Sequence, residues 1–180
     1  MTELALHILD IVQNSIVAKA TVIEISMMED TEKDLLTIEI ADNGKGMSED
    51  EVRMASDPYF TSRTTRKVGM GLPLFKQAVE LCAGTFTIES KPGIGTNVKA
   101  SMQYTHIDRQ PIGDIAGTIT LLISSNPTID FIYKHITNSG EYILDTIAIK
   151  NELENISLTN PKVIKFIREM IQENLKEITN

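Results

Sequence analysis

The sequence predicts an α/β fold, because two kinds of apolar periodicity alternate along the chain. Residues 3–19 carry apolar side chains at helical spacing, whereas residues 21–28 and 35–41 alternate apolar and polar side chains as half-buried strands do. A third observation is length. At 180 residues the chain can bury a sizeable core, and this length favours one domain or slightly more.

The rest of the first hundred residues continues this alternation of helix and strand. Ser48, with Glu51 three residues later, has the pattern of a capping box and predicts the start of a short helix. The stretch SDPYFTSRTTRKVGMG, at 56–71, has no period and is predicted as a loop. The next predicted elements are a helix at 72–84, with Pro73 in its first turn and Gly84 as its stop, and a β-hairpin at 85–104 around the turn KPGIG.

A second part of the chain is predicted to begin near residue 106, which divides the sequence into residues 1–105 and 106–180. Apolar residues between 112 and 123 have helical spacing, although Gly113 and Gly117 weaken it. The remaining predicted elements are a hairpin with strands at 128–136 and 141–149 around TNSG, and a helix at 160–178 with Asn160 as its cap. This second part is therefore predicted to be a small C-terminal α-β-β-α appendage.

Composition limits the classes of function. The net charge of −8 and the pI near 4.9 predict no nucleic-acid partner, because a phosphate backbone attracts basic surfaces. The single cysteine, Cys82, allows no internal disulfide and has no metal-ligand spacing. The first residues lack a basic signal-peptide region, and no apolar run reaches membrane-spanning length. We therefore expect a soluble cytoplasmic protein with no membrane contact.

The stretch IEIADNGKGMSEDE, at 38–51, places Asp42 where an apolar strand runs out. A carboxylate there is costly unless something donates hydrogen bonds to it. The Asn-Gly pair is typical of a type I′ hairpin turn, and a purpose-built ligand site is the other interpretation. An EF-hand is excluded because Gly44 and Gly46 stand where oxygen ligands are needed, and a P-loop is excluded because no Gly-Lys-Ser/Thr follows.

Asp10 and Asn14 are four residues apart and therefore neighbours on one face of the first predicted helix. A carboxylate and a carboxamide in this arrangement suit a hydrated Mg²⁺ that takes one or two oxygens from the protein. A solvated polar face is the alternative interpretation of the same pair.

Two further stretches contain glycines next to polar groups. Gly69 and Gly71 in KVGMGLPL open a helix, so backbone amides and the helix dipole there favour phosphates, although a Gly-x-Gly alone is most often a turn. Thr96 in PGIGTNV follows a glycine turn with a hydroxyl that can donate and accept. The cations that precede the helix and could join it on phosphates are Arg63, Arg66 and Lys67.

Taken together and in order, these stretches resemble a known family. DIVQNSIVAKA, ADNGKGM, VGMGL and GIGTNV resemble the N, G1, G2 and G3 boxes of the GHKL superfamily, the ATPase and kinase domain of DNA gyrase, mismatch-repair ATPases and histidine kinases. DPYFTSRTTRKVGMGLPL is similar to the F box, short lid and G2 box of nitrogen-sensor histidine kinases. The resemblance covers about residues 3–104 and leaves residues 106–180 outside it.

The resemblance implies a Bergerat fold, a two-layer α/β sandwich with helices on one face of a mixed sheet. It also implies that the cofactors are ATP and Mg²⁺. Asp42 would accept a hydrogen bond from the adenine amino group, Thr96 would support Asp42 and the adenine edge, and Asn14 would bind the magnesium ion. The glycines at 44 and 46 would let the backbone pass close to the base. The residues that would hold the phosphates are Gly69, Gly71 and Leu72 with the lid cations Arg63, Arg66 and Lys67.

The chain departs from the family pattern at two positions near the reacting phosphate. Asp10 stands where hydrolysing relatives usually carry glutamate and histidine kinases usually carry asparagine, so Asp10 is the candidate catalytic base. Val17 stands where many kinases carry a basic residue. Because nine residues precede Asp10, we expect no phosphoacceptor hairpin upstream of it. We therefore expect a stand-alone signalling kinase that phosphorylates an unidentified partner protein, or alternatively an ATP-operated switch with slow hydrolysis, with a homodimer through the C-terminal region as a further expectation.

Overall fold

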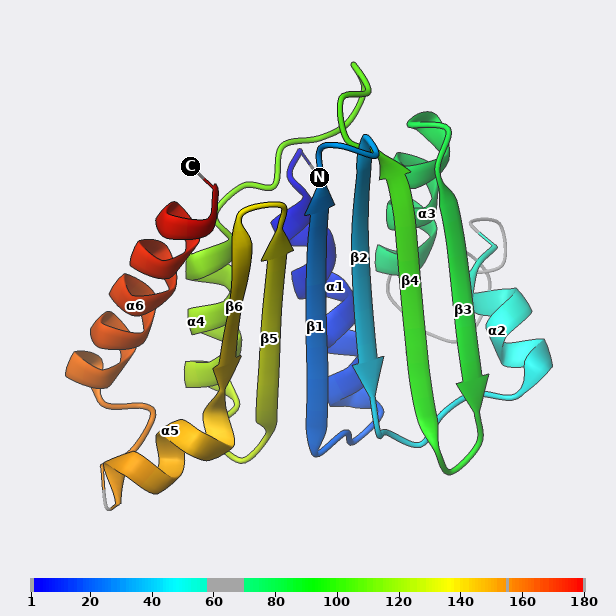
Figure 1. The fold of residues 1–180 in the computed structure, drawn as a ribbon. Helices are drawn as coiled ribbons and strands as arrows, with labels where there is room; N and C mark the ends of the chain where they lie inside the picture. The colour runs from blue at the N-terminus through cyan, green and yellow to red at the C-terminus, as the bar shows by residue number, and fades with distance from the viewer. Residues whose placement is uncertain (1, 58–69, 155, 180) are drawn as a thin grey trace.

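The computed structural model describes residues 2–57, 70–154 and 156–179, and shows one six-stranded sheet with the strand order β3-β4-β2-β1-β5-β6 (Figure 1). β1 and β5 are parallel neighbours, and every other neighbouring pair is antiparallel, so the sheet is mixed. The strands are β1 (Val22–Asp30), β2 (Leu35–Asp42), β3 (Thr85–Lys91), β4 (Gly95–Gln103), β5 (Asp130–Thr137) and β6 (Gly140–Asp145).

The helices lie mainly on one face of this sheet, behind it in Figure 1. α1 packs between α3 and α4, and α6 packs against α4 and β6. In the described part of the chain the other face carries no helix, which confirms the predicted two-layer sandwich. The helices are α1 (Leu4–Val17), α2 (Glu49–Ala55), α3 (Gly71–Leu81), α4 (Ile115–Ser125), α5 (Thr146–Leu153) and α6 (Pro161–Thr179).

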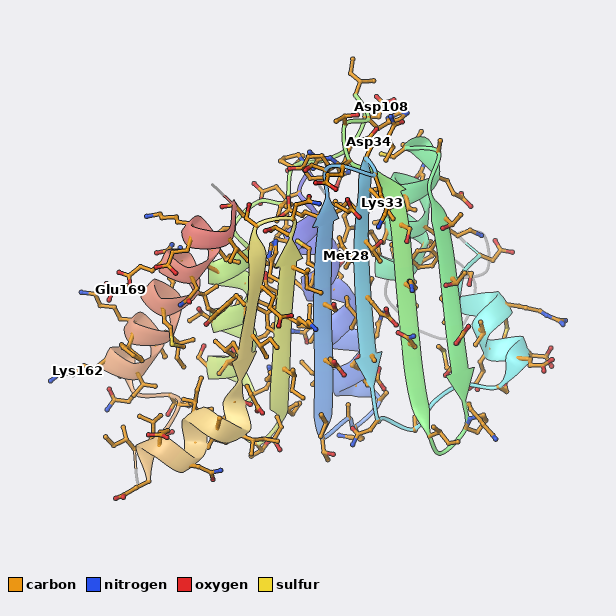
Figure 2. All side chains as sticks on the ribbon, viewed as in Figure 1. Met28, Lys33, Asp34, Asp108, Lys162 and Glu169 are labelled. Atoms are coloured by element: carbon orange, nitrogen blue, oxygen red, sulfur yellow. The ribbon has the colours of Figure 1, made fainter. Side chains whose placement is uncertain are left out.

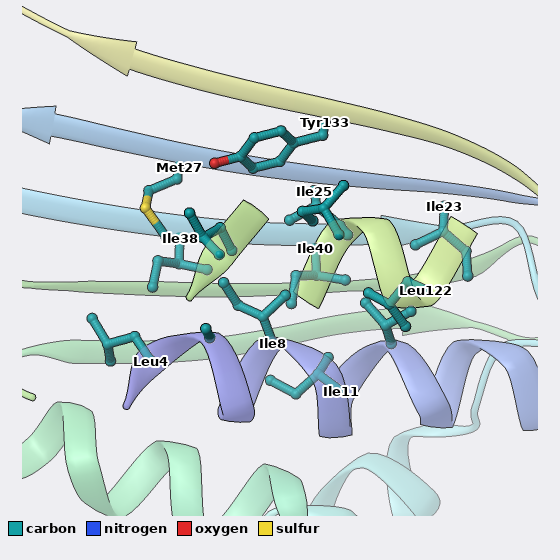
Figure 3. Close-up of a cluster of buried hydrophobic side chains, with 14 of the residues drawn as sticks. Leu4, Ile8, Ile11, Ile23, Ile25, Met27, Ile38, Ile40, Leu122 and Tyr133 are labelled. Carbon is teal, nitrogen blue, oxygen red and sulfur yellow. The ribbon is translucent and has the colours of Figure 1, made fainter. Parts of the chain in front are cut away.

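The core lies between α1, α4 and the sheet (Figure 3). Leu4, Ile8 and Ile11 of α1 repeat every three to four residues, which places all three on the side that faces the strands. Each is at most 2% exposed, and burial of such a side chain contributes about 2 kcal/mol. The strand residues that meet them alternate along β1 and β2, namely Ile23, Ile25, Met27, Ile38 and Ile40.

α6 is a helix with one apolar side and one charged side. Val163, Ile167 and Ile171 are buried against the rest of the molecule. On the other side, Lys162 and Glu169 project away from the sheet (Figure 2). Tertiary packing of the apolar side therefore holds this helix in place, as its sequence pattern predicts.

The C-terminal part of the chain completes the same sheet. β5 lies beside β1 in a parallel register that runs from Val22 opposite Asp130 to Glu29 opposite Thr137. At the end of the sheet far from Asp42, a buried polar pair reinforces this contact, since the Glu29 Oε1 and His135 Nε2 atoms are 2.6 Å apart. The division of the chain at residue 105 stays a prediction, but the structure shows that both parts share one sheet.

The predicted strand at 141–149 is wrong in its second half. β6 ends at Asp145, and α5 begins at the next residue, so the appendage has one more helix than predicted. The Asp145 side chain accepts a hydrogen bond from the backbone N–H of Ile147, which caps the helix. The Thr146 hydroxyl oxygen accepts from the Phe131 N–H at 2.8 Å and fixes the start of the helix against β5.

Gly84 does not end α3 in the way predicted. The helix ends at Leu81, and Ala83 adopts the left-handed conformation with φ of 53°. Gly84 is needed for a different reason, because a Cβ atom there would lie 2.5 Å from the carbonyl oxygen of Ser101 on β4. The glycine therefore lets the chain enter β3 close to β4.

α2 follows the stretch after Asp42, so this stretch does not form the hairpin turn that one interpretation favoured. The predicted capping box of α2 is confirmed, with the Ser48 N–H donating to Glu51 Oε2 and the Glu51 N–H donating to Ser48 Oγ. Among the helices described, none has both the length and the apolar character needed to cross a membrane.

Candidate functional site

Asp42 occupies the last position of β2, between two neighbouring strands of the sheet. It lies opposite Ile23 on β1 and opposite Thr96 on β4. The Asp42 Oδ1 atom accepts a hydrogen bond from the Gly44 N–H at 2.8 Å, and Oδ2 accepts from the Ser15 hydroxyl at 2.6 Å. A carboxylate can accept about four hydrogen bonds, so Asp42 is held in one orientation and keeps capacity for a ligand.

Ser15 is a site residue that the sequence analysis missed. It lies on α1 directly after Asn14 and is 3% exposed, on the side of the helix that faces the sheet. A hydroxyl in this otherwise apolar stripe was the signal that could have identified it, because a buried hydroxyl needs a partner. The partner is Asp42, so α1 and β2 are joined directly at the site.

Asn43 fixes the same end of the sheet. Its Oδ1 atom accepts from the N–H groups of Thr21 and Val22 at 2.8 and 2.9 Å, and its Nδ2 donates to the Thr21 hydroxyl at 2.9 Å. The side chain thereby ties the turn between α1 and β1 to the end of β2. Asp42 and Asn43 are therefore held by hydrogen bonds from Ser15 of α1 and from the residues at the start of β1.

Asn14 and Asp10 lie on α1, the helix whose Ser15 donates to Asp42. The Nδ2 atom of Asn14 is buried and has no hydrogen-bond partner among the described residues. Such an unpaired amide is costly unless a ligand satisfies it. Asp10 faces the start of α3, because a Cβ atom added to Gly71 would lie 2.9 Å from the Asp10 Cβ. The structure therefore brings the N-box helix against the helix that the second Gly-x-Gly opens.

The glycines after Asp42 approach other parts of the protein closely. Gly46 has φ of +67°, and a Cβ atom there would lie 2.0 Å from the Lys91 carbonyl oxygen at the end of β3. A Cβ atom on Gly44 would lie 2.9 Å from Ala18 at the end of α1. Close approach to Ala18 and Lys91 therefore accounts for both glycines within the protein. The family resemblance implied close approach to the adenine base instead.

The Thr96 hydroxyl lies 2.8 Å from the hydroxyl of Ser90 on β3. The direct support for Asp42 comes from Ser15 and Gly44, and Thr96 stands beside Asp42 on the next strand. A cavity of about 320 Å³ is lined by residues of β2, β3 and β4 that include Asp42, Ser90 and Thr96. Neither Asn14 nor Asp10 is among the residues that line this cavity.

Leu72, in the first turn of α3, is buried in the core at 3% exposure. Its described role is packing, which holds the start of α3 in place. The other predicted phosphate-binding residues, Arg63, Arg66, Lys67 and Gly69, lie outside the described residues. In the described ranges, no group of three or more His, Cys, Asp or Glu side chains could hold a metal ion.

Comparisons with known proteins identify relatives of part of the chain. The sensor protein DegM of Bacillus sp. (strain B21-2) is 35% identical over 95 residues, which are 53% of this chain and 25% of DegM. The sensor histidine kinase YvrG of Bacillus subtilis (strain 168) is 32% identical over 77 residues, which are 41% of this chain and 13% of YvrG. The chain thus spans a quarter or less of the length of these relatives.

Among solved structures, the N-terminal domain of a DNA repair protein has a TM-score of 0.56 at 21% identity, and the match covers 81% of this chain and 53% of that one. This likeness supports the fold. Residues 2–106, more than half of the chain, match the family described as histidine kinase-, DNA gyrase B- and HSP90-like ATPase. The chain therefore belongs to the family of histidine kinase-, DNA gyrase B- and HSP90-like ATPases.

Proposed function

We propose that this chain binds Mg-ATP, with the adenine base at Asp42 and the metal at Asn14. The observation that carries the proposal is the pair of hydrogen bonds that orient Asp42, because they leave an aligned acceptor at a strand end in a family of ATPases. Such an acceptor suits the adenine amino group. A guanine carbonyl at the same position would face the carboxylate unpaired, so the site would discriminate against GTP.

Asn14 fits a magnesium site by its chemistry. Its buried Nδ2 atom has no hydrogen-bond partner in the described part of the chain, and rotation about the last side-chain bond exchanges the positions of the amide oxygen and nitrogen. Magnesium keeps several water ligands and needs only one or two protein oxygens when phosphates supply others, so the lack of a larger ligand cluster among the described residues does not conflict with it. Replacement Asn14→Ala should remove the magnesium dependence of ATP binding and leave adenosine binding nearly unchanged.

The proposed reaction is transfer of the γ-phosphoryl group to a partner protein. The support is the similarity to proteins named as a sensor protein and a sensor histidine kinase, of which the chain matches a quarter or less. The start of α3 supplies a helix N-terminus, which favours bound phosphate. Asp10 lies against that helix start and is the candidate base for the acceptor group or for water.

The test is ATP turnover by the purified protein in Mg²⁺, wild type against Asp10→Asn, with labelled ATP and candidate partner proteins in parallel. Label on a partner that requires an intact Asp42 supports phosphoryl transfer. Turnover in the absence of any partner that disappears in Asp10→Asn makes Asp10 a water-activating base and refutes a pure kinase. Failure of the wild type to bind ATP in calorimetry overturns the proposal as a whole.

A nucleotide-operated switch with slow hydrolysis is the second candidate, and one observation favours it. Asn43 of the site region binds the first residue of β1, and that same residue is the first to pair with β5. A movement of Asn43 at the site would therefore act directly on the residue of β1 that begins the pairing with β5. Hydrogen-exchange protection of β5 and β6 should differ between ATP and ADP if this candidate is correct, and identical protection would eliminate it.

A further inference from the structure

Ser90, near the end of β3, lies where two of the glycine motifs meet. Its Oγ atom accepts a hydrogen bond from the Met47 N–H at 2.8 Å, at the exit of the loop that follows Asp42. The same atom lies 3.0 Å from the Gly95 carbonyl oxygen and 2.8 Å from the Thr96 hydroxyl. One hydroxyl group therefore joins the loop after Asp42 to the start of β4.

The count of protons assigns a direction to these bonds. A carbonyl oxygen can only accept, so the Ser90 proton goes to Gly95. Ser90 has no second proton, so Thr96 must be the donor in the bond between the two hydroxyls. The Thr96 proton is then committed to Ser90, and the Thr96 oxygen offers only lone pairs to its other neighbours.

We propose that Ser90 is a positioning residue that makes Thr96 an acceptor and thereby contributes to the choice of adenine over guanine. The inference rests on the proposed adenine site at Asp42, which lies opposite Thr96 on the neighbouring strand. Two acceptors side by side suit the amino group of adenine, which is a donor. They oppose the carbonyl group of guanine at the same ring position, which is itself an acceptor.

Loss of the Ser90 hydroxyl frees the Thr96 proton, and Thr96 can then donate to a carbonyl group. The strand pairing does not depend on this side chain, because the β3–β4 ladder runs from Thr85 opposite Ser101 to Lys91 opposite Gly95 through backbone groups. Ser101 offers a matched control. Its hydroxyl lies 3.2 Å from the Thr37 hydroxyl, at the far end of the same hairpin.

The experiment measures ATP affinity by calorimetry and GTP affinity by competition, in Mg²⁺, for wild type, Ser90→Ala, Ser90→Thr and Ser101→Ala. We expect Ser90→Ala to reduce the ratio of ATP to GTP affinity about fivefold, the scale of one hydrogen bond. Ser90→Thr keeps a hydroxyl and should restore most of the ratio. Ser101→Ala should leave the ratio unchanged. Ser90→Cys, which has only a weak donor, replaces the alanine variant if that variant does not fold.

An equal loss of ATP and GTP affinity in Ser90→Ala would mean that the side chain is merely structural, and an unchanged ratio would also overturn the inference. These failures differ from failure of the proposed function. If Asp42→Asn weakens ATP binding while Ser90→Ala keeps the wild-type ratio, only the role of Ser90 is refuted. If the wild type does not bind ATP, the adenine site is refuted, and the role of Ser90 is refuted with it.

Discussion

Replacement of Asp42 by asparagine is the substitution that tests the site most directly. The structure predicts that the fold tolerates it. An asparagine oxygen in place of Oδ1 still accepts from the Gly44 N–H, and an amide nitrogen in place of Oδ2 can donate to the Ser15 oxygen once that hydroxyl rotates. Both protein contacts are thereby kept, while the side chain loses its charge and one acceptor.

We expect the substitution to weaken the binding of ATP. An acceptor that is ionised contributes about 2 kcal/mol to a hydrogen bond, which corresponds to about a thirtyfold increase in the Kd for ATP. Calorimetric titration with ATP measures this change, and thermal unfolding of the same samples verifies the fold. Ser15→Ala removes only one support of the carboxylate and should weaken binding by about 1 kcal/mol. An unchanged Kd in Asp42→Asn, with an unchanged Tm, would show that the adenine amino group does not bind there.

Three further predictions concern stability. Gly46→Ala should lower the free energy of unfolding by about 2 kcal/mol or more in urea denaturation, because φ is +67° and the new Cβ would lie 2.0 Å from the Lys91 carbonyl. Burial raises the pKa of Glu29, but the interactions with His135, Tyr104 and Arg109 together outweigh burial and hold the pKa below its ordinary 4.5. Glu29→Gln should therefore lose less stability than wild type as the pH falls below 4.5. Ile171→Ala should cost about 3 kcal/mol without a change in ATP affinity, because α6 packs against α4, β5 and β6 whereas Asp42 and Thr96 lie on β2 and β4. Reduced ATP affinity would contradict this reasoning.

The sequence predicted the elements that repeat a clear period. The strand that ends at Asp42 and the capping box at Ser48 were found because their patterns are local. The start of α5 was missed because IAI at 147–149 alternates like a strand. The Asp145 side chain caps a helix there through one hydrogen bond from the Ile147 N–H. At this point the helix cap outweighs the alternating pattern.

Within the site, the motif residues could be placed in order along the chain, but their support could not. Ser15 lies in an apolar stripe, and the neighbouring residues do not indicate that its hydroxyl donates to a carboxylate 27 residues later in the chain. Ser90 is similar, since its partners lie on the loop after Asp42 and at the start of β4, which only the folded sheet brings together. Contacts between segments this far apart depend on which strands become neighbours in the folded sheet, and local sequence patterns do not reveal that.

The parallel pairing of β1 with β5 also bears on how the chain reaches its native state. Val22 meets Asp130 across more than a hundred intervening residues, and a large loop must close before this contact forms. During synthesis, one edge of β1 therefore stays unpaired until the C-terminal third of the chain has left the ribosome. Slow refolding and a tendency of early intermediates to associate through that edge are the expected consequences, because non-local strand pairing is the slow step in sheets of this kind.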